Sequence, residues 1–260
     1  MGPRTTYIFC INTGRAGSHY LSQLLSHVSS CVAFHEAEPI CNGPAMRQYL
    51  SGRPDRMRRM AATKVAAIEE VRKGSDCTYV ETNHCFIKGF GWYLPGLLGQ
   101  ERMGVIVLTR HRDAVARSVL RIGCSPLVPW GREWLITPDV TDPLVPPPGH
   151  ASSARLVYEL FRLLKLPFRG VRYYGALRLR PPRTPKLIYD YELRCVQWYI
   201  DETMALADAY QRTFPCIRYL HVDLEELNEP AGVRRVLDHF GLEENDRMPQ
   251  AVGHATNVRA

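Results

Sequence analysis

The hydrophobic and polar positions of this chain alternate between short apolar runs and longer stretches with helical spacing. A β-branched and aromatic run over 7–11 stops at the polar turn 12–14, and apolar residues then recur at helical spacing over 20–28. The same order returns where the apolar run 104–109 precedes a helical stripe over 114–120. The pattern therefore predicts two strand-turn-helix units.

Further elements are expected between and after these two units. They are a helix over 46–71 interrupted at 52–54, a buried strand over 77–80, a long helix over 189–210, a strand over 217–222 and a helix over 233–240 closed by Gly241. Strands that alternate with helices predict an α/β fold with a central parallel sheet. We expect a P-loop-like three-layer αβα arrangement that binds ligands at the carboxyl edge of its strands.

Two segments do not follow this alternation. Residues 126–150 contain seven prolines, which cannot pack as a central strand or a regular helix, so a surface loop or lid is expected there. The stretch 168–186 carries six basic residues and no acidic one, which predicts a basic loop that holds an anionic group or is simply solvated. Both segments are assigned to a single domain over 1–260.

Composition and charge narrow the class of protein. With 260 residues, 45% hydrophobic and 23% charged, the chain is neither disordered, collagenous nor a coiled coil. A net charge of +7 favours anionic partners such as nucleotides, nucleic acid or acidic lipid. Eight cysteines without a Cys-x-x-Cys pair argue against a zinc ribbon and predict free thiols in a reducing compartment. Without a secretory h-region or a long apolar run, a cytoplasmic protein with no membrane span is expected.

The first predicted turn has the composition of a phosphate cradle. Its residues are Gly14, Arg15, Ala16, Gly17, Ser18 and His19. Two glycines let backbone N–H groups converge on an anion, the following helix adds a positive partial charge, and Arg15 adds a full one. The turn lacks the Gly-Lys-Ser/Thr of nucleotide hydrolases and does not match the dinucleotide pattern G-x-G-x-x-G.

The second strand-turn-helix unit carries a matching pair. Arg110 ends the predicted strand, and Ser118 follows eight positions later on the predicted helix. A strand-end arginine and a hydroxyl on the next helix can both reach one phosphate.

These motifs together resemble the sulfotransferases that use 3′-phosphoadenosine 5′-phosphosulfate (PAPS). The family has a [K/R]-[S/A]-G-[S/T] loop for the 5′-phosphosulfate, which residues 15–18 match, and an R-x7-S motif for the 3′-phosphate, which Arg110 and Ser118 match. Residues 218–224 with the helix after them are similar to a third family segment. The arginine in the loop is similar to the bacterial and tyrosylprotein-type members, and the Lys-Thr-His segment of the phenol branch is not found. Arg112 stands where a proline is common and adds positive charge beside a phosphate.

The resemblance also suggests a general base. Residues 34–39 resemble the His-Glu-Pro segment of the arginine-loop members, and Glu36 lies 21 positions after Arg15, as the catalytic glutamate does in the tyrosylprotein branch. A carboxylate near the phosphosulfate can take the proton of the acceptor. We therefore expect Glu36 to be the base, with Glu38 as the competing carboxylate and His84, at the end of a predicted strand, as the alternative base. A solvated acidic turn and a hydrogen-bonded structural histidine are the simpler interpretations.

The function that follows is sulfuryl transfer from PAPS to a hydroxyl or amine of a small-molecule acceptor, with Arg15 stabilising the leaving phosphate and with no metal. A P-loop kinase of small molecules and a non-catalytic nucleotide-binding module are the alternatives. Nucleic acid is not expected, because no stacking aromatics interrupt the basic stretch. The acceptor pocket is expected among 39–60, 92–98 and 126–150, with tryptophans as apolar walls. Lys88 is expected to contact an anionic acceptor or to lie on the surface, and residues 257–259 to fold over the cofactor or fray.

Overall fold

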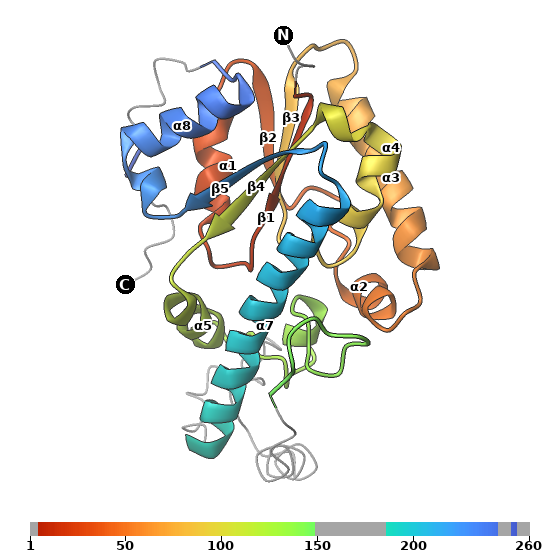
Figure 1. Ribbon diagram of the computed structural model, residues 1–260, viewed down its shortest axis with the longest axis vertical. Helices are drawn as coiled ribbons and strands as arrows, with labels where there is room; N and C mark the ends of the chain where they lie inside the picture. The colour runs from red at the N-terminus through yellow and green to blue at the C-terminus, as the bar shows by residue number, and fades with distance from the viewer. Residues whose placement is uncertain (1–4, 149–185, 244–250, 254–260) are drawn as a thin grey trace, which may run out of the picture.

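A five-stranded sheet forms the centre of the computed structural model, which describes residues 5–148, 186–243 and 251–253. Every strand is parallel to its neighbours, and the strand order is β2-β3-β1-β4-β5 (Figure 1). The strands are β1 (Tyr7–Ile11), β2 (Cys31–His35), β3 (Thr78–Thr82), β4 (Met103–Thr109) and β5 (Arg218–Asp223). The all-parallel sheet between helices confirms the predicted three-layer α/β fold.

Helices cover both faces of the sheet (Figure 1). On one face lie α1 (Ser18–Ser26) and α8 (Pro230–Phe240), and on the other lie α3 (Asp55–Arg72), α4 (Leu94–Leu98) and the long α7 (Lys186–Thr213). Near the carboxyl edge, α5 (Arg112–Arg121) packs against α7. The described residues also contain α2 (Gly43–Leu50) and the short 3₁₀ turns η1 (Phe90–Trp92), η2 (Gln100–Arg102), η3 (Gly131–Glu133) and η5 (Glu226–Asn228).

The central strand β1 is buried along its whole length. Tyr7, Phe9 and Ile11 belong to the core cluster under α3 and α7, whereas Ile8 and Cys10 belong to the cluster under α1 and α8. A strand covered on both faces needs apolar residues at every position, because successive side chains point to opposite faces. This explains why the run 7–11 is apolar throughout and does not alternate with polar residues.

The sequence pattern locates most elements but misses one strand. The predicted break at 52–54 separates α2 from α3, and the predicted helices and strands after residue 77 are confirmed within a few residues. Strand β2 was not predicted, since 34–39 was interpreted only as a segment after the first helix. β2 forms the edge of the sheet, each of its residues is only partly buried, and it pairs in register with β3 from Cys31↔Thr78 to His35↔Thr82.

The described part of the proline-rich segment is irregular apart from η3, yet it is not a purely exposed loop. Val128, Leu135 and Ile136 are buried, the last two in a cluster with α5 and α7, so the segment forms part of the core beside the site. The basic loop at 168–186 lies outside the described residues except for Lys186, as do residues 257–259. All eight cysteines are free thiols. Among the described residues, no helix combines the length and apolarity that crossing a bilayer requires.

A glycine at the start of β4 provides a test of the packing between the sheet and α8. A Cβ atom on Gly104 would lie 2.5 Å from the Phe240 ring and 3.0 Å from Thr5. We expect Gly104→Ala to lower the free energy of unfolding by about 1–3 kcal/mol, the usual effect of overpacking a core. Urea denaturation measures the change.

The matched control is Gly96→Ala. Gly96 lies in α4, and a Cβ there would meet nothing within 4 Å. Because alanine favours a helix over glycine, this variant should be as stable as the wild type or more stable. Equal stability of the two variants would contradict the packing described here.

Candidate functional site

A cavity of about 440 Å³ opens at the carboxyl edge of the sheet. One part of its wall is polar and comes from the turn after β1 and from the residues that follow β2, β3 and β4. The other part is mainly apolar and comes from α5 and the proline-rich segment. The lining residues are Thr13, Gly14, Arg15, Gly17, Ser18, His19, Tyr20, His35, Glu36, His84, Arg110, Val119, Ile122, Cys124, Trp130, Trp134, Leu135 and Leu224.

The turn between β1 and α1 has an unusual backbone. Gly14, Arg15 and Gly17 have φ angles of 70°, 56° and 95°, in the left-handed region that favours glycine. Gly17 also has no room for a side chain, because a Cβ would lie 2.3 Å from Leu224. The left-handed residues turn the chain sharply into the N-terminus of α1, where backbone N–H groups are free of intrahelical partners. This geometry is suited to binding an anion.

Asn12 and side chains from distant elements support the turn. The Asn12 Oδ1 atom accepts a hydrogen bond from the Gly14 N–H at 2.8 Å. The Tyr199 hydroxyl, on α7, donates to the Thr13 carbonyl at 2.8 Å, and one Arg110 nitrogen donates to the Arg15 carbonyl at 3.1 Å. The shape of the turn therefore depends on α7 and on the residue that follows β4.

The structure brings Arg15, Arg110 and Ser118 together. The Nε atom of Arg15 donates to the Ser118 hydroxyl at 3.0 Å, and both guanidinium groups lie at the mouth of the cavity. Among the described residues, neither arginine forms an ion pair with a carboxylate. The two positive charges are therefore available to a bound anion.

Arg112 does not add to these charges as the sequence suggested. Its guanidinium forms a two-pronged pair with Asp201 of α7, in which Nε lies 2.7 Å from Oδ1. The carboxylate raises the pKa of Arg112 through this hydrogen bond and compensates its charge. Arg112 thus ties α5 to α7.

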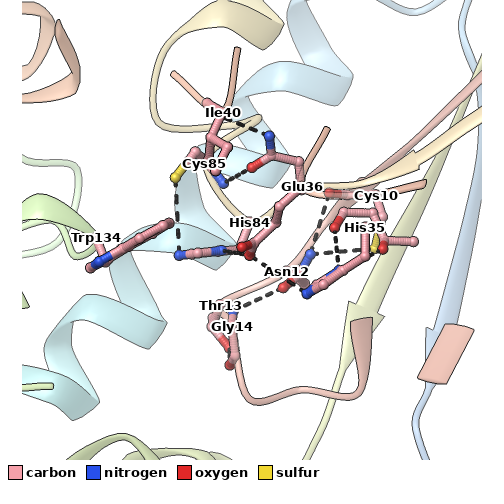
Figure 2. A network of polar contacts seen from close by, with 12 residues as sticks. Cys10, Asn12, Thr13, Gly14, His35, Glu36, Ile40, His84, Cys85 and Trp134 are labelled. Atoms are coloured by element: carbon pink, nitrogen blue, oxygen red, sulfur yellow. Dashed lines mark hydrogen bonds and ion pairs between the residues drawn. The ribbon is translucent and has the colours of Figure 1, made fainter. Parts of the chain in front are cut away.

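Glu36 and His84 form a hydrogen-bonded pair. The Glu36 Oε1 atom lies 2.6 Å from Nδ1 of His84, although the residues follow different strands (Figure 2). Glu36 has a φ of 52°, a strained conformation for a residue with a side chain. His84 lies against Gly14, where an added Cβ would contact its ring at 3.5 Å. The two candidate bases are therefore partners beside the turn over 13–18.

The charge states of this pair follow from burial. Burial, together with the nearby Lys88 ammonium, lowers the pKa of His84 to about 4. Burial alone would raise the pKa of Glu36, but the hydrogen bond from His84, together with electrostatic contributions from neighbours that include Lys88, outweighs it and keeps that pKa below its ordinary value. At neutral pH the pair is a carboxylate and a neutral imidazole whose proton lies on Nδ1, because a carboxylate only accepts. The Nε2 atom, 4.0 Å from the Cys85 sulfur, then carries a lone pair.

Trp134 covers the other side of the imidazole. Its ring is stacked on His84 with centroids 5.5 Å apart and planes 23° from parallel (Figure 2). Lys88 donates to the Trp134 carbonyl at 2.7 Å and lies over the Tyr199 ring. Lys88 is fully buried, so it is neither a surface residue nor among the cavity-lining residues, and burial lowers its pKa to about 8. Lys88 instead holds the segment that shields His84.

The other predicted site residues occupy different positions. Ser18 and His19 line the cavity, and the His19 ring lies 5.0 Å from that of His35. Ala16 is buried beneath the turn and does not line the cavity, and Glu38 is exposed, with its Oε2 accepting from the Ile40 N–H. Of the four tryptophans, only Trp130 and Trp134 line the cavity; Trp92 and Trp198 pack in the core clusters.

Sequence reasoning missed the supporting contacts of Tyr199, Trp134 and Leu224. No local signal marks them, since each acts on a residue at least 50 positions away. Within the described residues, no group of three or more His, Cys, Asp or Glu side chains is arranged to hold a metal ion.

Comparison with known proteins adds no assignment: no family model matches the chain, and no curated protein matches its sequence.

Acid should destabilise the protein through His84. The pKa of this histidine is about 4 in the folded chain and 6.5 as its ordinary value, so the stability it contributes is full above pH 6.5 and is lost as pH falls toward 4. We expect His84 alone to lower the free energy of unfolding by about 2 kcal/mol between pH 7 and pH 5. Urea denaturation of the wild type and His84→Asn at both pH values measures this difference. If both proteins lose the same stability, His84 is not held neutral.

Proposed function

We propose that this protein is a PAPS-dependent sulfotransferase that acts on a hydroxyl or amine of a small-molecule acceptor. One observation carries the proposal: the two uncompensated arginines and the Glu36–His84 pair face the same cavity at the carboxyl edge of the sheet. A donor with two separate phosphate groups needs two anion sites, and proton removal from an acceptor needs a base beside them.

The arrangement of the cations supports a bisphosphorylated donor. The turn over 13–18 and Arg15 suit the 5′-phosphosulfate, because N–H groups at a helix N-terminus and a guanidinium both bind phosphate oxygens. Arg110 and the hydroxyl of Ser118 suit the 3′-phosphate. When the ligand binds, the Ser118 hydroxyl exchanges its hydrogen bond with Arg15 for one with the 3′-phosphate. No metal is required for either contact.

The Glu36–His84 pair supports a division of roles in the transfer. The Nε2 lone pair of His84 takes the proton of the acceptor, while Glu36 fixes the tautomer and stabilises the imidazolium that forms. The acceptor oxygen or nitrogen bonds to sulfur, and the bond from sulfur to the bridging oxygen breaks. Its electron pair stays on the 5′-phosphate, where Arg15 stabilises the growing charge. This proposal makes Glu36 the partner of the base, where the sequence suggested Glu36 as the base itself.

The kinase alternative has less support. A P-loop kinase places a lysine on the β- and γ-phosphates and a hydroxyl on magnesium, and the turn has Ala16-Gly17-Ser18 in place of Gly-Lys-Ser/Thr. A non-catalytic nucleotide-binding module would not need a carboxylate-histidine pair in the same cavity.

The first test is nucleotide binding. We expect 3′-phosphoadenosine 5′-phosphate (PAP) to bind more tightly than adenosine 5′-phosphate, because the extra phosphate gains a charge-assisted contact worth about 1.5–3 kcal/mol. Arg110→Ala should remove most of this preference. Arg117→Ala should keep it, because Arg117 is exposed like Arg110 but lies on α5 and does not line the cavity. Titration calorimetry of the wild type and both variants with each nucleotide measures the six affinities. Equal binding of the two nucleotides would refute the assignment, and tighter binding of ATP with magnesium would favour the kinase.

The second test is turnover. With radiolabelled PAPS and 2-naphthol as a probe hydroxyl, His84→Asn should lower transfer to naphthol or water by on the order of 10²–10⁴-fold while PAP binding changes little. Glu36→Gln should lose less, because the amide oxygen still accepts from Nδ1. If Glu36→Gln is the slower variant and His84→Asn stays active, Glu36 is the base, as the sequence suggested.

A further inference from the structure

A buried ion pair lies behind the Glu36–His84 pair and takes no part in the chemistry proposed above. The Lys64 ammonium, on α3, lies 2.8 Å from Oε1 of Glu81, on β3, and both side chains are 0% exposed. Replacing such a pair with apolar residues is often neutral or stabilising, so its presence is weak evidence for a role in stability. The groups that the pair contacts indicate a more specific role.

The polar atoms of the ion pair form a connected network. Besides Lys64, the Glu81 carboxylate accepts from the Asn83 amide at 2.9 Å and from the Tyr79 hydroxyl at 2.8 Å. Lys64 also lies over the Phe90 ring, with its Nζ 5.4 Å from the centroid. The carboxylate therefore fixes two donors, Lys64 and Asn83, in place.

Both donors then reach the backbone of the two turns that carry the site. Lys64 donates to the Ala37 carbonyl at 2.5 Å, one residue after Glu36. Asn83 donates to the Ile40 carbonyl at 3.2 Å, and its Oδ1 accepts from the Cys85 N–H at 2.8 Å. The Lys64 contact thus holds the turn after β2. The two Asn83 contacts join that turn, through Ile40, to Asn83 and Cys85, the residues on each side of His84.

Glu36 needs such support. Its left-handed backbone, with φ of 52°, costs free energy for a residue with a side chain and persists only where the surroundings impose it. Among the described residues, the Glu36 carboxylate contacts the imidazole of His84 at 2.6 Å and that of His35 at 3.8 Å. The nearest backbone support that a buried side chain gives this strained segment is the hydrogen bond from Lys64 to the Ala37 carbonyl.

We propose that Lys64, held by Glu81, is a positioning residue that fixes the Ala37 carbonyl in the turn after Glu36 and thereby sets the hydrogen bond between Glu36 and His84. Asn83 is the second support, because its hydrogen bond to Ile40 holds the His84 turn at a fixed distance from the turn after β2. For catalysis the inference rests on the proposed function, but the hydrogen bond it concerns can be measured without any substrate.

The test is proton NMR of the full chain at neutral pH. The Nδ1 proton shared with a carboxylate gives a low-field resonance, and its upfield shift in Glu36→Gln, where a neutral amide is the acceptor, assigns it. The double variant Lys64→Met/Glu81→Gln removes both charges together, so no unpaired charge is left buried. We expect this variant to fold, to lose or shift the resonance, and to have a higher Glu36 pKa, because the carboxylate loses its donor.

Two further variants complete the test. Asn83→Ala keeps the ion pair and should shift the same resonance to a smaller extent. If the double variant does not fold, Asn83→Ala is the variant that tests the proposal. Gly104→Ala lowers stability at the other end of β4 and should leave the resonance unchanged. A folded double variant, or a folded Asn83→Ala, with the wild-type resonance and Glu36 pKa would overturn the proposal.

Turnover separates the two proposals. If the protein is a sulfotransferase, the double variant should lose on the order of 10²-fold in turnover, with PAP affinity unchanged, since a misplaced catalytic group has an effect of this size. If the double variant loses the resonance while the wild-type protein neither binds PAP nor transfers sulfate, the positioning role is supported and the proposed function is refuted.

Discussion

The parallel pairing of β1 with β3 and β4 is the constraint on which the site depends. Tyr7 is paired with Tyr79 on one side and with Met103 on the other, so the three strands start level and end at one edge. Because all three run in the same direction, the turns that follow them converge there. Those turns carry Arg15, His84 and Arg110, and an antiparallel neighbour would have moved one of them to the opposite end of the sheet.

Some of the positive charges around the cavity are paired with a carboxylate and others are not. The unpaired charges define the candidate site. Arg112 lies close to Arg110 in the chain but is neutralised by Asp201, and Lys64 is neutralised by Glu81. Arg15 and Arg110 have no carboxylate partner in the part of the chain that the structure describes. Charges that are paired fix helices and turns in place, whereas unpaired charges near a cavity attract anions. Arginines two positions apart, Arg110 and Arg112, thus differ in that one is paired with a carboxylate of the described residues and the other is not.

The sequence pattern predicted the features that lie within one strand-turn-helix unit. It missed the features that depend on the order of the strands in the sheet. Residues 14–18 and the spacing of Arg110 and Ser118 lie within single strand-turn-helix units, so their placement could be inferred directly. The contact between Glu36 and His84 could not, because it requires that β2 pair with β3, and β2 itself was missed as a short, partly buried edge strand. Lys88 was misplaced for a similar reason: its partner, the Trp134 carbonyl, lies 46 residues away in an irregular segment.

The close contact between Gly17 and Leu224 also concerns the order in which the chain is made. The turn at 13–18 leaves the ribosome before Tyr199 and Leu224, yet it packs against Leu224 and is held by the Tyr199 hydroxyl. Contacts between residues so far apart in sequence form late, since the loop between them must first be closed. The turn over 13–18 therefore reaches its final shape only after β5 has been synthesised and has paired with β4. A nascent chain that ends before Leu224 has the residues of the turn without its geometry.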